Sequence, residues 1–392
     1  MKNYSCLMTL ILMVSCNTFQ DKTVKTGIPT EILPLNINPI FKGKTLSDFT
    51  EIKSIIPLHG IKSSELLSTI SKVVVFNGSF FILDRNFSKL YVFDLKGEFK
   101  YSIGDLGEAP GQYQNINDFY IDKIKNIIVL YSNDSMSIFT YNLSGKFIER
   151  VKLPFFGYSF AQLDSTSYLF YTNFNRTEKR YNIFETNLEG EIFSEKFPYS
   201  EDQNMGIGFS GFLVPSSVAN EYNLSIGLSD TVFNISRNKI QAKYFFNFND
   251  KNLKNDIRLN HNAFFKNGLD YSLLRNNFIE TNDVCFYDYQ HNRVINYGFF
   301  FKSSFQNYNF NRQRQEDFFE KIINVPVGTV DNEIFISFLD TEIVRLFIKE
   351  NPKLFSQIRD KQPLLYEAVK QNKDNLSPIL VTFSLQSHKN NL

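Results

Sequence analysis

The segment Asp94-Leu95-Lys96-Gly97-Glu98-Phe99 has two relatives along the chain, Asn142-Leu143-Ser144-Gly145-Lys146-Phe147 and Asn187-Leu188-Glu189-Gly190-Glu191-Ile192. Their glycines, Gly97, Gly145 and Gly190, lie 48 and then 45 residues apart. Each segment joins two short runs of aromatic and aliphatic residues, and glycine is favoured where a tight turn needs positive φ. A fainter copy has Asn238 in place of the glycine, 48 residues after Gly190. The spacing therefore indicates an internal repeat of strands and turns.

A second turn inside the repeat fixes the number of strands. Asn77-Gly78 and Lys125-Asn126 each separate two further apolar runs, so one period holds about four strands and two hairpin turns. A period of roughly 40 to 50 residues with four strands is typical of a propeller blade, whereas solenoid repeats of that length are helical. We expect blades around residues 73–103, 116–153, 159–197, 209–248 and 276–309, and a sixth from about residue 325.

Two features near the ends of the chain complete the expected ring. The run Glu51 to Leu58 precedes the first blade, and an N-terminal strand that pairs with the last blade removes an exposed sheet edge. Helical spacing between about residues 340 and 374 predicts a small helical insertion, after which Pro378 to Leu385 returns to strand character. The predicted fold class is all-β: a six-bladed β-propeller over residues 46–388, with the helical insertion before its closing strand.

Composition allows a large core and argues against one class of partner. The 392 residues are 43% hydrophobic and include 42 Phe and 20 Tyr, far more than a disordered chain carries. Lys and Arg number 42 against 41 Asp and Glu, so no overall positive field attracts a phosphate backbone. We therefore expect no nucleic-acid partner.

The first sixteen residues read as a targeting segment. Lys2 is followed by an apolar run from Leu7 to Val14, which is too short to span a bilayer as a helix and is typical of a signal peptide. Ser15 directly before Cys16 matches a bacterial lipobox, which predicts lipidation of Cys16 after cleavage; the alternative is an ordinary signal peptide with an accidental cysteine. Residues 17–45 contain three prolines and no amphipathic period, so we expect a linker there.

The segment from Ile103 to Tyr113, together with Val92-Phe93-Asp94 and Gly97, resembles the six-bladed β-propeller lipoproteins of Bacteroidota, whose fold is similar to NHL-type propellers. The resemblance implies a lipid-anchored protein of the bacterial cell envelope, at the periplasmic or cell-surface face of the outer membrane. It brings no catalytic residue set. The segment's glycines lack the lysine and following helix of a phosphate-binding loop. We expect a rigid crossover between blades instead, built on the structural turn residues Gly107, Pro110, Gly111 and Tyr113.

Residues that carry chemistry are sparse. The four histidines form no HExxH pattern and no EF-hand run occurs, so we predict neither a metal nor a cofactor. Cys285 lies in an apolar run and is expected to be a buried hydrophobe. Carboxylates fall near strand ends, where they could pair for acid/base chemistry, although turn formation is the favoured interpretation. These carboxylates are Asp84, Asp118, Asp122 and Asp134.

Aromatic strand residues could stack on sugars or peptides if they were exposed, although packing between blades is the favoured interpretation. Examples are Tyr168, Phe170, Tyr171 and Phe174, and the run from Phe299 to Phe301.

The sequence favours a ligand-binding or protein-interaction module, because propellers present loops around one axial depression and no catalytic residue is identified. The ligand is left open: an envelope protein, a glycan or a peptide. The alternative is an extracytoplasmic enzyme of the glycan hydrolase or lyase type, with carboxylates meeting at the propeller axis. We expect a monomer that contacts the membrane through its lipid anchor only.

Overall fold

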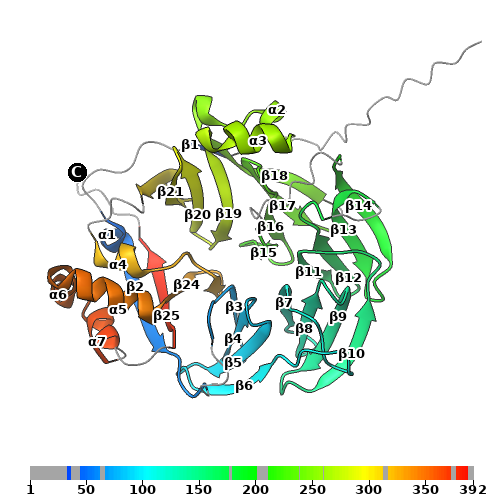
Figure 1. Ribbon diagram of the computed structural model, residues 1–392, viewed down its shortest axis with the longest axis horizontal. Helices are drawn as coiled ribbons and strands as arrows, with labels where there is room; N and C mark the ends of the chain where they lie inside the picture. Colours follow the sequence, from blue (N-terminus) through cyan, green and yellow to red (C-terminus); the bar gives the residue numbers. More distant parts are fainter. Residues whose placement is uncertain are drawn as a thin grey trace, which may run out of the picture.

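The computed structural model describes residues 33–36, 45–61, 67–175, 179–200, 211–237, 239–258, 260–311, 317–371 and 377–386. Within them, six β-sheets are arranged around a ring, and the prediction of a six-bladed β-propeller is confirmed (Figure 1). The predicted signal peptide, the lipidation site Cys16 and the turn residue Asn238 lie outside the described residues. Among the described residues, no helix has both the length and the apolar character needed to cross a bilayer.

Blades 1, 2 and 3 are four-stranded antiparallel sheets in which each strand pairs with the next along the chain. Blade 1 consists of β3 (Lys72–Phe76), β4 (Ser79–Asp84), β5 (Lys89–Asp94) and β6 (Phe99–Ile103). Blade 2 consists of β7 (Asp118–Asp122), β8 (Ile127–Ser132), β9 (Ser137–Asn142) and β10 (Phe147–Lys152). Blade 3 consists of β11 (Ser159–Asp164), β12 (Ser167–Tyr171), β13 (Tyr181–Asn187) and β14 (Ile192–Pro198).

Blades 4 and 5 follow the same plan with additions that the sequence did not predict. Blade 4 consists of β15 (Val214–Pro215), β16 (Tyr222–Ser225), β17 (Thr231–Ser236) and β18 (Lys239–Asn247). Blade 5 consists of β19 (Leu273–Glu280), β20 (Val284–His291), β21 (Val294–Phe301) and β22 (Gln306–Asn311). Between them lie short helices: η2 (Asn249–Lys251), α2 (Asn255–Arg258), α3 (His261–Asn267) and η3 (Gly268–Asp270).

Part of the predicted linker belongs to the folded body. Strand β1 (Leu33–Asn36) pairs in parallel with β18 and makes blade 4 five-stranded. Leu35 is buried in the hydrophobic cluster between blades 4 and 5. The prolines of this region suggested a linker, but Pro34 lies in an edge strand, where a missing N–H is tolerated. The linker interpretation of residues 17–45 is therefore wrong for residues 33–36.

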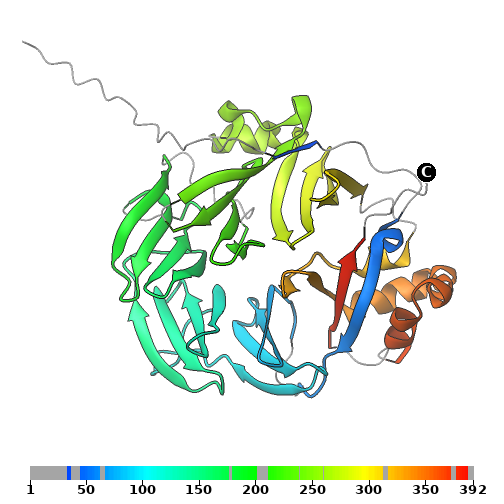
Figure 2. The same cartoon turned by 180° about the vertical axis from the view of Figure 1, so that it is seen from behind.

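The ring closes in blade 6, as the sequence predicted. The blade consists of β23 (Gly328–Val330), β24 (Ile334–Leu339), β25 (Ile379–Leu385) and the N-terminal strand β2 (Thr50–Pro57). β2 pairs antiparallel with β25 from Thr50↔Leu385 to Pro57↔Ile379, and Figure 2 shows the two strands side by side. The helical insertion lies between β24 and β25 and consists of α5 (Thr341–Glu350), α6 (Pro352–Lys361) and α7 (Pro363–Gln371).

A single-turn helix leads into the closing strand and is held by two carboxylates. The helix α1 (Leu46–Phe49) begins where Leu46 N donates to Glu320 Oε1 at 2.7 Å and Ser47 N donates to Asp317 Oδ2 at 2.9 Å. Asp317 is the N-cap residue of α4 (Phe318–Ile322), and Glu320 lies within that helix. Burial raises the pKa of Glu320 to about 7, so its carboxyl group changes charge near neutral pH.

The core is divided into clusters that lie between neighbouring blades. In β4 every residue is buried, and alternate residues enter different clusters. Phe81 and Leu83 pack with blade 2, whereas Phe80 and Ile82 pack with blade 6. Successive strand residues point to opposite faces, and both faces of a blade are covered here. The same packing buries Tyr168, Phe170, Tyr171 and the run from Phe299 to Phe301, as the favoured interpretation predicted. Phe174 is only partly buried and packs against the cluster between blades 3 and 4.

The repeated glycines have positive φ and also contact the preceding blade. Gly97, Gly145 and Gly190 have φ of 87°, 80° and 86°. A Cβ added at Gly145 would lie 3.0 Å from the ring of Tyr101 at the outer edge of blade 1, and one at Gly190 would lie 2.8 Å from Leu153, just after blade 2. At Gly97 a Cβ would overlap Pro57 O in the closing strand β2. Each glycine turn therefore lets one blade dock closely on the one before it.

Gly97→Ala is expected to lower the free energy of unfolding by about 2 to 4 kcal/mol, because the added methyl group meets backbone as well as an unfavourable φ. Gly78→Ala is the matched control, since Gly78 also has positive φ of 68° but an added Cβ meets nothing within 4 Å. We expect the control to lose about 1 kcal/mol. Urea unfolding of both variants measures the difference, and equal losses would show that docking on β2 does not need the glycine.

Candidate functional site

Four consecutive blades are joined by polar contacts where their first strands begin, near the centre of the ring (Figure 1). Lys72, at the start of β3, donates to Asp118 Oδ1 at 2.7 Å. Ser159, at the start of β11, donates to Asp118 Oδ2 at 2.5 Å. Leu213 N, directly before β15, donates to Ser159 Oγ at 3.0 Å. We call Lys72, Arg85, Asn117, Asp118, Asn133, Tyr158, Ser159 and Phe212 the Asp118 cluster.

Asp118 holds this cluster together and is shielded from solvent. Its side chain has 0% exposure, and it also accepts from Phe119 N at 2.8 Å and Phe160 N at 3.0 Å. A carboxylate with four donors in a buried site has no face left for a substrate. The acid/base interpretation of Asp118 is therefore not favoured by its geometry.

The other three candidate carboxylates do not join Asp118. Asp84 is buried and accepts from the backbone of Ser68, Asn86 and Phe87. Asp122 accepts from the backbone N–H groups of the following turn, and Asp134 is exposed. Asp84 and Asp122 have the local backbone contacts that turn-forming aspartates make.

Arg85 is a cation of the Asp118 cluster that is fixed by both hydrogen bonds and aromatic rings. Its Nε donates to Asn117 O at 2.6 Å and its Nη1 donates to Tyr158 Oη at 2.8 Å. The guanidinium carbon lies 3.9 Å from the ring centroid of Phe212 and 4.7 Å from that of Tyr158. Lys72 Nζ also lies 5.9 Å from the Phe212 ring. Contacts from blades 2, 3 and 4 thus fix the position of the guanidinium group, and Arg85 is a partly exposed residue.

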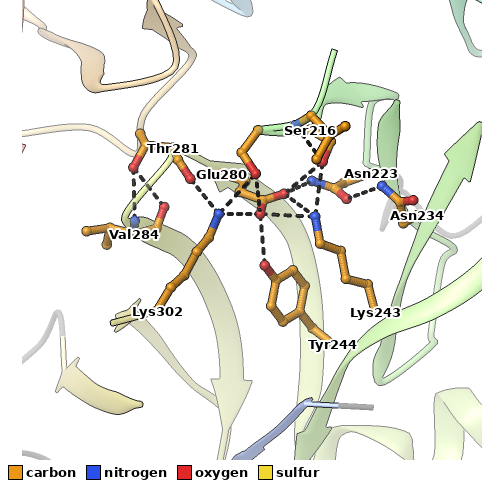
Figure 3. Close-up of polar contacts among 11 residues, drawn as sticks. Ser216, Asn223, Asn234, Lys243, Tyr244, Glu280, Thr281, Val284 and Lys302 are labelled. Carbon is orange, nitrogen blue, oxygen red and sulfur yellow. Dashed lines mark hydrogen bonds and ion pairs between the residues drawn. The ribbon is translucent and has the colours of Figure 1, made fainter. Parts of the chain in front are cut away.

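A second ionic cluster lies between blades 4 and 5, centred on Glu280 at the end of β19 (Figure 3). Lys243 Nζ donates to Glu280 Oε2 at 2.8 Å, Tyr244 Oη donates to Oε1 at 2.9 Å, and Lys302 also pairs with Oε1. Burial alone would raise the pKa of Glu280, but the charges of Lys243 and Lys302 outweigh it and lower the pKa to about 2. We call Glu280, Lys243, Tyr244 and Lys302 the Glu280 cluster. Its ion pairs and hydrogen bonds hold blades 4 and 5 together, and we refer to this role as a structural pin.

A bulge in β18 directs two neighbouring residues to the same carboxylate. Val232 pairs with Tyr244 and Phe233 pairs with Ala242, so Lys243 is the extra residue between two register positions. Because alternation is broken there, Lys243 and Tyr244 both reach Glu280. The sequence analysis missed these residues, since no single residue type or spacing in β18 or β19 marks a bulge.

Two other groups among the described residues, the Ser272–His291 pair and Cys285, are not placed for chemistry on a substrate. Ser272 Oγ lies 2.6 Å from His291 Nδ1, but Ser272 is 2% exposed and out of reach of a substrate. Burial raises the pKa of the Cys285 thiol to about 12, which suits the inert cysteine that was expected. Among the described residues, no group of three or more His, Cys, Asp and Glu side chains is placed to hold a metal ion.

The predicted crossover residues lie between blades 1 and 2. Gly107 and Gly111 have φ of 151° and 79°, and Tyr113 is 1% exposed within the cluster shared by these blades. Tyr113 packs edge-on against Phe139, with ring centroids 5.6 Å apart, and its hydroxyl donates to Ser88 O at 3.3 Å. Pro110 precedes Gly111 in the turn. Tyr113 is thus packed between the two blades, whereas Leu106 and the residues from Glu108 to Pro110 are exposed.

Comparison with known families gives one match that spans almost the whole folded body. Residues 36–384 match a family described as a domain of unknown function, DUF4934. The chain belongs to this DUF4934 family. No curated protein matches the sequence.

Solved structures similar to this DUF4934 chain share its fold. One, described as a "putative exported protein" from Bacteroides fragilis NCTC 9343, has a TM-score of 0.74 at 19% identity and covers 91% of this chain and 100% of its own. A DUF4221 family member from Bacteroides vulgatus has a TM-score of 0.54 at 10% identity, covering 86% of this chain and 98% of its own. At these identities the likeness shows the propeller fold alone.

Glu280→Gln in this DUF4934 protein is expected to lower the free energy of unfolding at pH 7 by about 3 to 5 kcal/mol, because two lysines lose their buried partner. The pKa of Glu280 is lower in the folded state than the ordinary 4.5, so the contribution is complete above pH 4.5 and is lost as the pH falls towards 2. The gap between wild type and variant should therefore narrow over that range.

Asp270→Asn is the control, because Asp270 pairs with Arg293 in an exposed ion pair and should change stability by less than about 0.5 kcal/mol. Denaturant unfolding at pH 7 and pH 3 measures both variants. A Glu280 variant as stable as the control at pH 7 would contradict the role of the Glu280 cluster as a pin.

Proposed function

We propose that this protein is a binding module of the bacterial cell envelope, whose ligand occupies the axial surface at the Asp118 cluster. The observation that carries the proposal is the convergence of Arg85, Tyr158 and Phe212 from three different blades. Propeller axes are common ligand sites, and polar groups that are held rigidly before binding lower its entropic cost.

The geometry favours binding over catalysis. Asp118, the carboxylate that the cluster contains, is fully covered, whereas Arg85, Tyr158 and Phe212 are partly exposed. Cations and aromatic rings of this kind recognise a ligand without supplying a base or a nucleophile. No observation on the described residues favours the glycan hydrolase or lyase alternative over the binding module.

The envelope location rests on the N-terminal sequence and on one structural relative. Residues 1–16 read as a lipoprotein signal peptide ending at Cys16, and the Bacteroides fragilis neighbour is described as exported. The proposal includes a lipid anchor on Cys16, an NHL-like propeller that remains a monomer, and a partner that is an envelope protein, a glycan or a peptide.

The binding proposal is tested with a panel of neutral and acidic mono- and oligosaccharides and short peptides, using the chain from Asn17 onward, which keeps every described element. At least one compound should raise the melting temperature of the wild type, and Phe212→Ala should weaken that compound's binding by about tenfold or more. Phe265→Ala is the control, because Phe265 is 61% exposed on α3. Absence of binding across the panel, or binding unchanged by Phe212→Ala, would refute the proposed site.

The anchor is tested by metabolic labelling with palmitate in a bacterial host that processes lipoproteins. The wild type should incorporate label and sediment with membranes, whereas Cys16→Ser should do neither. An unlabelled wild-type chain, or a labelled Cys16→Ser chain, would refute lipidation of this residue.

A further inference from the structure

We propose that the Asp118 cluster binds the carboxylate group of a small ligand, on a donor-rich surface formed by Arg85, Lys72, Asn117 and Asn133. The inference rests on the proposed function and names the chemistry of its ligand. It follows from how the hydrogen-bond acceptors of the cluster are already used.

The side-chain amides of two asparagines have a fixed orientation. Asn117 Oδ1 accepts from Asn133 N at 2.7 Å, and a backbone N–H requires the oxygen of the amide as its acceptor. Tyr131 Oη accepts from Gly157 N, so its own proton goes to Asn133 Oδ1 at 3.1 Å. Contacts among the described residues therefore use the oxygens of both amides and leave both Nδ2 groups as donors.

The two cations add further donors to the same surface. Arg85 has five N–H groups, and its strongest contacts within the described residues use one at Nε and one at Nη1. A longer contact joins Nη2 to Tyr158 O at 3.4 Å. Lys72 Nζ donates to Asp118 and to Phe119 O, both at 2.7 Å, which accounts for two of its three protons. Arg85 and Lys72 thus keep N–H groups that are not committed to the described residues.

Acceptors of the cluster, in contrast, are covered or occupied. Asp118 is buried with four donors, and Asn117 O accepts from Arg85. Tyr158 Oη accepts from Arg85 Nη1 and Tyr158 O lies opposite Nη2. A surface with donors in excess selects a ligand group that only accepts, and a planar carboxylate matches the fork of a guanidinium.

The Glu280 cluster provides an internal comparison, because it also holds two cations and one carboxylate. There Lys302 Nζ contacts Glu280, Thr281 O and Ser217 Oγ, so all three of its protons have acceptors. Lys243 Nζ contacts both oxygens of Glu280 and Ser216 Oγ. The N–H groups of both lysines thus have acceptors within the protein. The Asp118 cluster differs, because Arg85 and Lys72 keep N–H groups without such acceptors among the described residues.

The experiment compares each acid with its own methyl ester, by calorimetry or fluorescence titration of the chain from Asn17 onward. One arm uses glucuronate and galacturonate, and the other uses N-acetyl dipeptides with a free C-terminal carboxylate. In at least one arm the acid should bind about tenfold or more tightly than the ester, because a charge-assisted hydrogen bond is lost on esterification. The arm that responds identifies the source of the carboxylate.

Arg85→Gln and Lys72→Met should each remove most of the preference for the acid. Arg359→Gln is the control, because Arg359 likewise lies over a tyrosine ring, at 5.1 Å from the Tyr366 centroid, and bonds its hydroxyl at 3.2 Å, but on the helices of blade 6. Melting temperatures check that each variant folds. The comparison of acid with ester in the wild type keeps the test valid if an Arg85 variant is unstable.

The outcomes separate the carboxylate inference from the proposed function. A neutral compound that binds as well as its acid counterpart, and is lost in Phe212→Ala, overturns the carboxylate inference and leaves the binding module intact. Acids that bind equally to wild type, Arg85→Gln and Lys72→Met also overturn the inference. Failure of every compound, neutral or acidic, overturns both.

Discussion

Ring closure by the pairing of β2 with β25 is the constraint on which the rest of the structure depends. A blade buries both faces only if it has a neighbour on each side, and hydrophobic clusters lie between blades 1 and 2, 2 and 3, 3 and 4, and 6 and 1. An open array would expose one face of blade 1 and one face of blade 6. The N-terminal strand completes blade 6, and Gly97 brings blade 1 into close contact with that strand. The first strands of the blades can meet around one axis because the ring is closed.

The blade count and the closing strand could be predicted from the sequence because they leave periodic signals. The glycine turns recur at blade length, and apolar runs recur at strand length. The strand β1 and the helices α2, α3 and α4 leave no such signal, since each is short and stabilised by tertiary contacts. Pro34 even pointed to a linker, and only its place at a sheet edge makes it compatible with β1.

The candidate site could be predicted only in part, for a related reason. Asp118 was identified among the carboxylates near strand ends, but its partners Lys72 and Ser159 lie 46 and 41 residues away along the chain. Each partner is an ordinary polar residue at the start of a strand, and the relation between them exists only once three blades are side by side. Arg85 and Phe212 belong together for the same reason, since no local pattern in one blade records what the other contributes.

Ion pairs on or beside the first strands share an asymmetry between acid and base. Asp118, Glu280 and Asp288 have side-chain exposures of 0%, 1% and 1%, whereas their cationic partners Lys72, Lys243, Lys302 and Arg275 range from 14% to 29%. Long basic side chains can bury their aliphatic part and keep the charged end near water, which carboxylates cannot do. In each of these pairs the positively charged side chain is therefore more exposed to solvent than the carboxylate.

The pairing of β2 with β25 also determines the order of events during biosynthesis. The strand that closes the ring is synthesised near the beginning of the chain, and its partner is synthesised near the end. During translation, β2 has no strand to pair with until all the intervening blades have been synthesised. A nascent chain interrupted before residue 379 leaves β2 without its neighbour in the sheet. An unfinished chain therefore cannot close its ring, and the edge of β2 stays unpaired until β25 has been made.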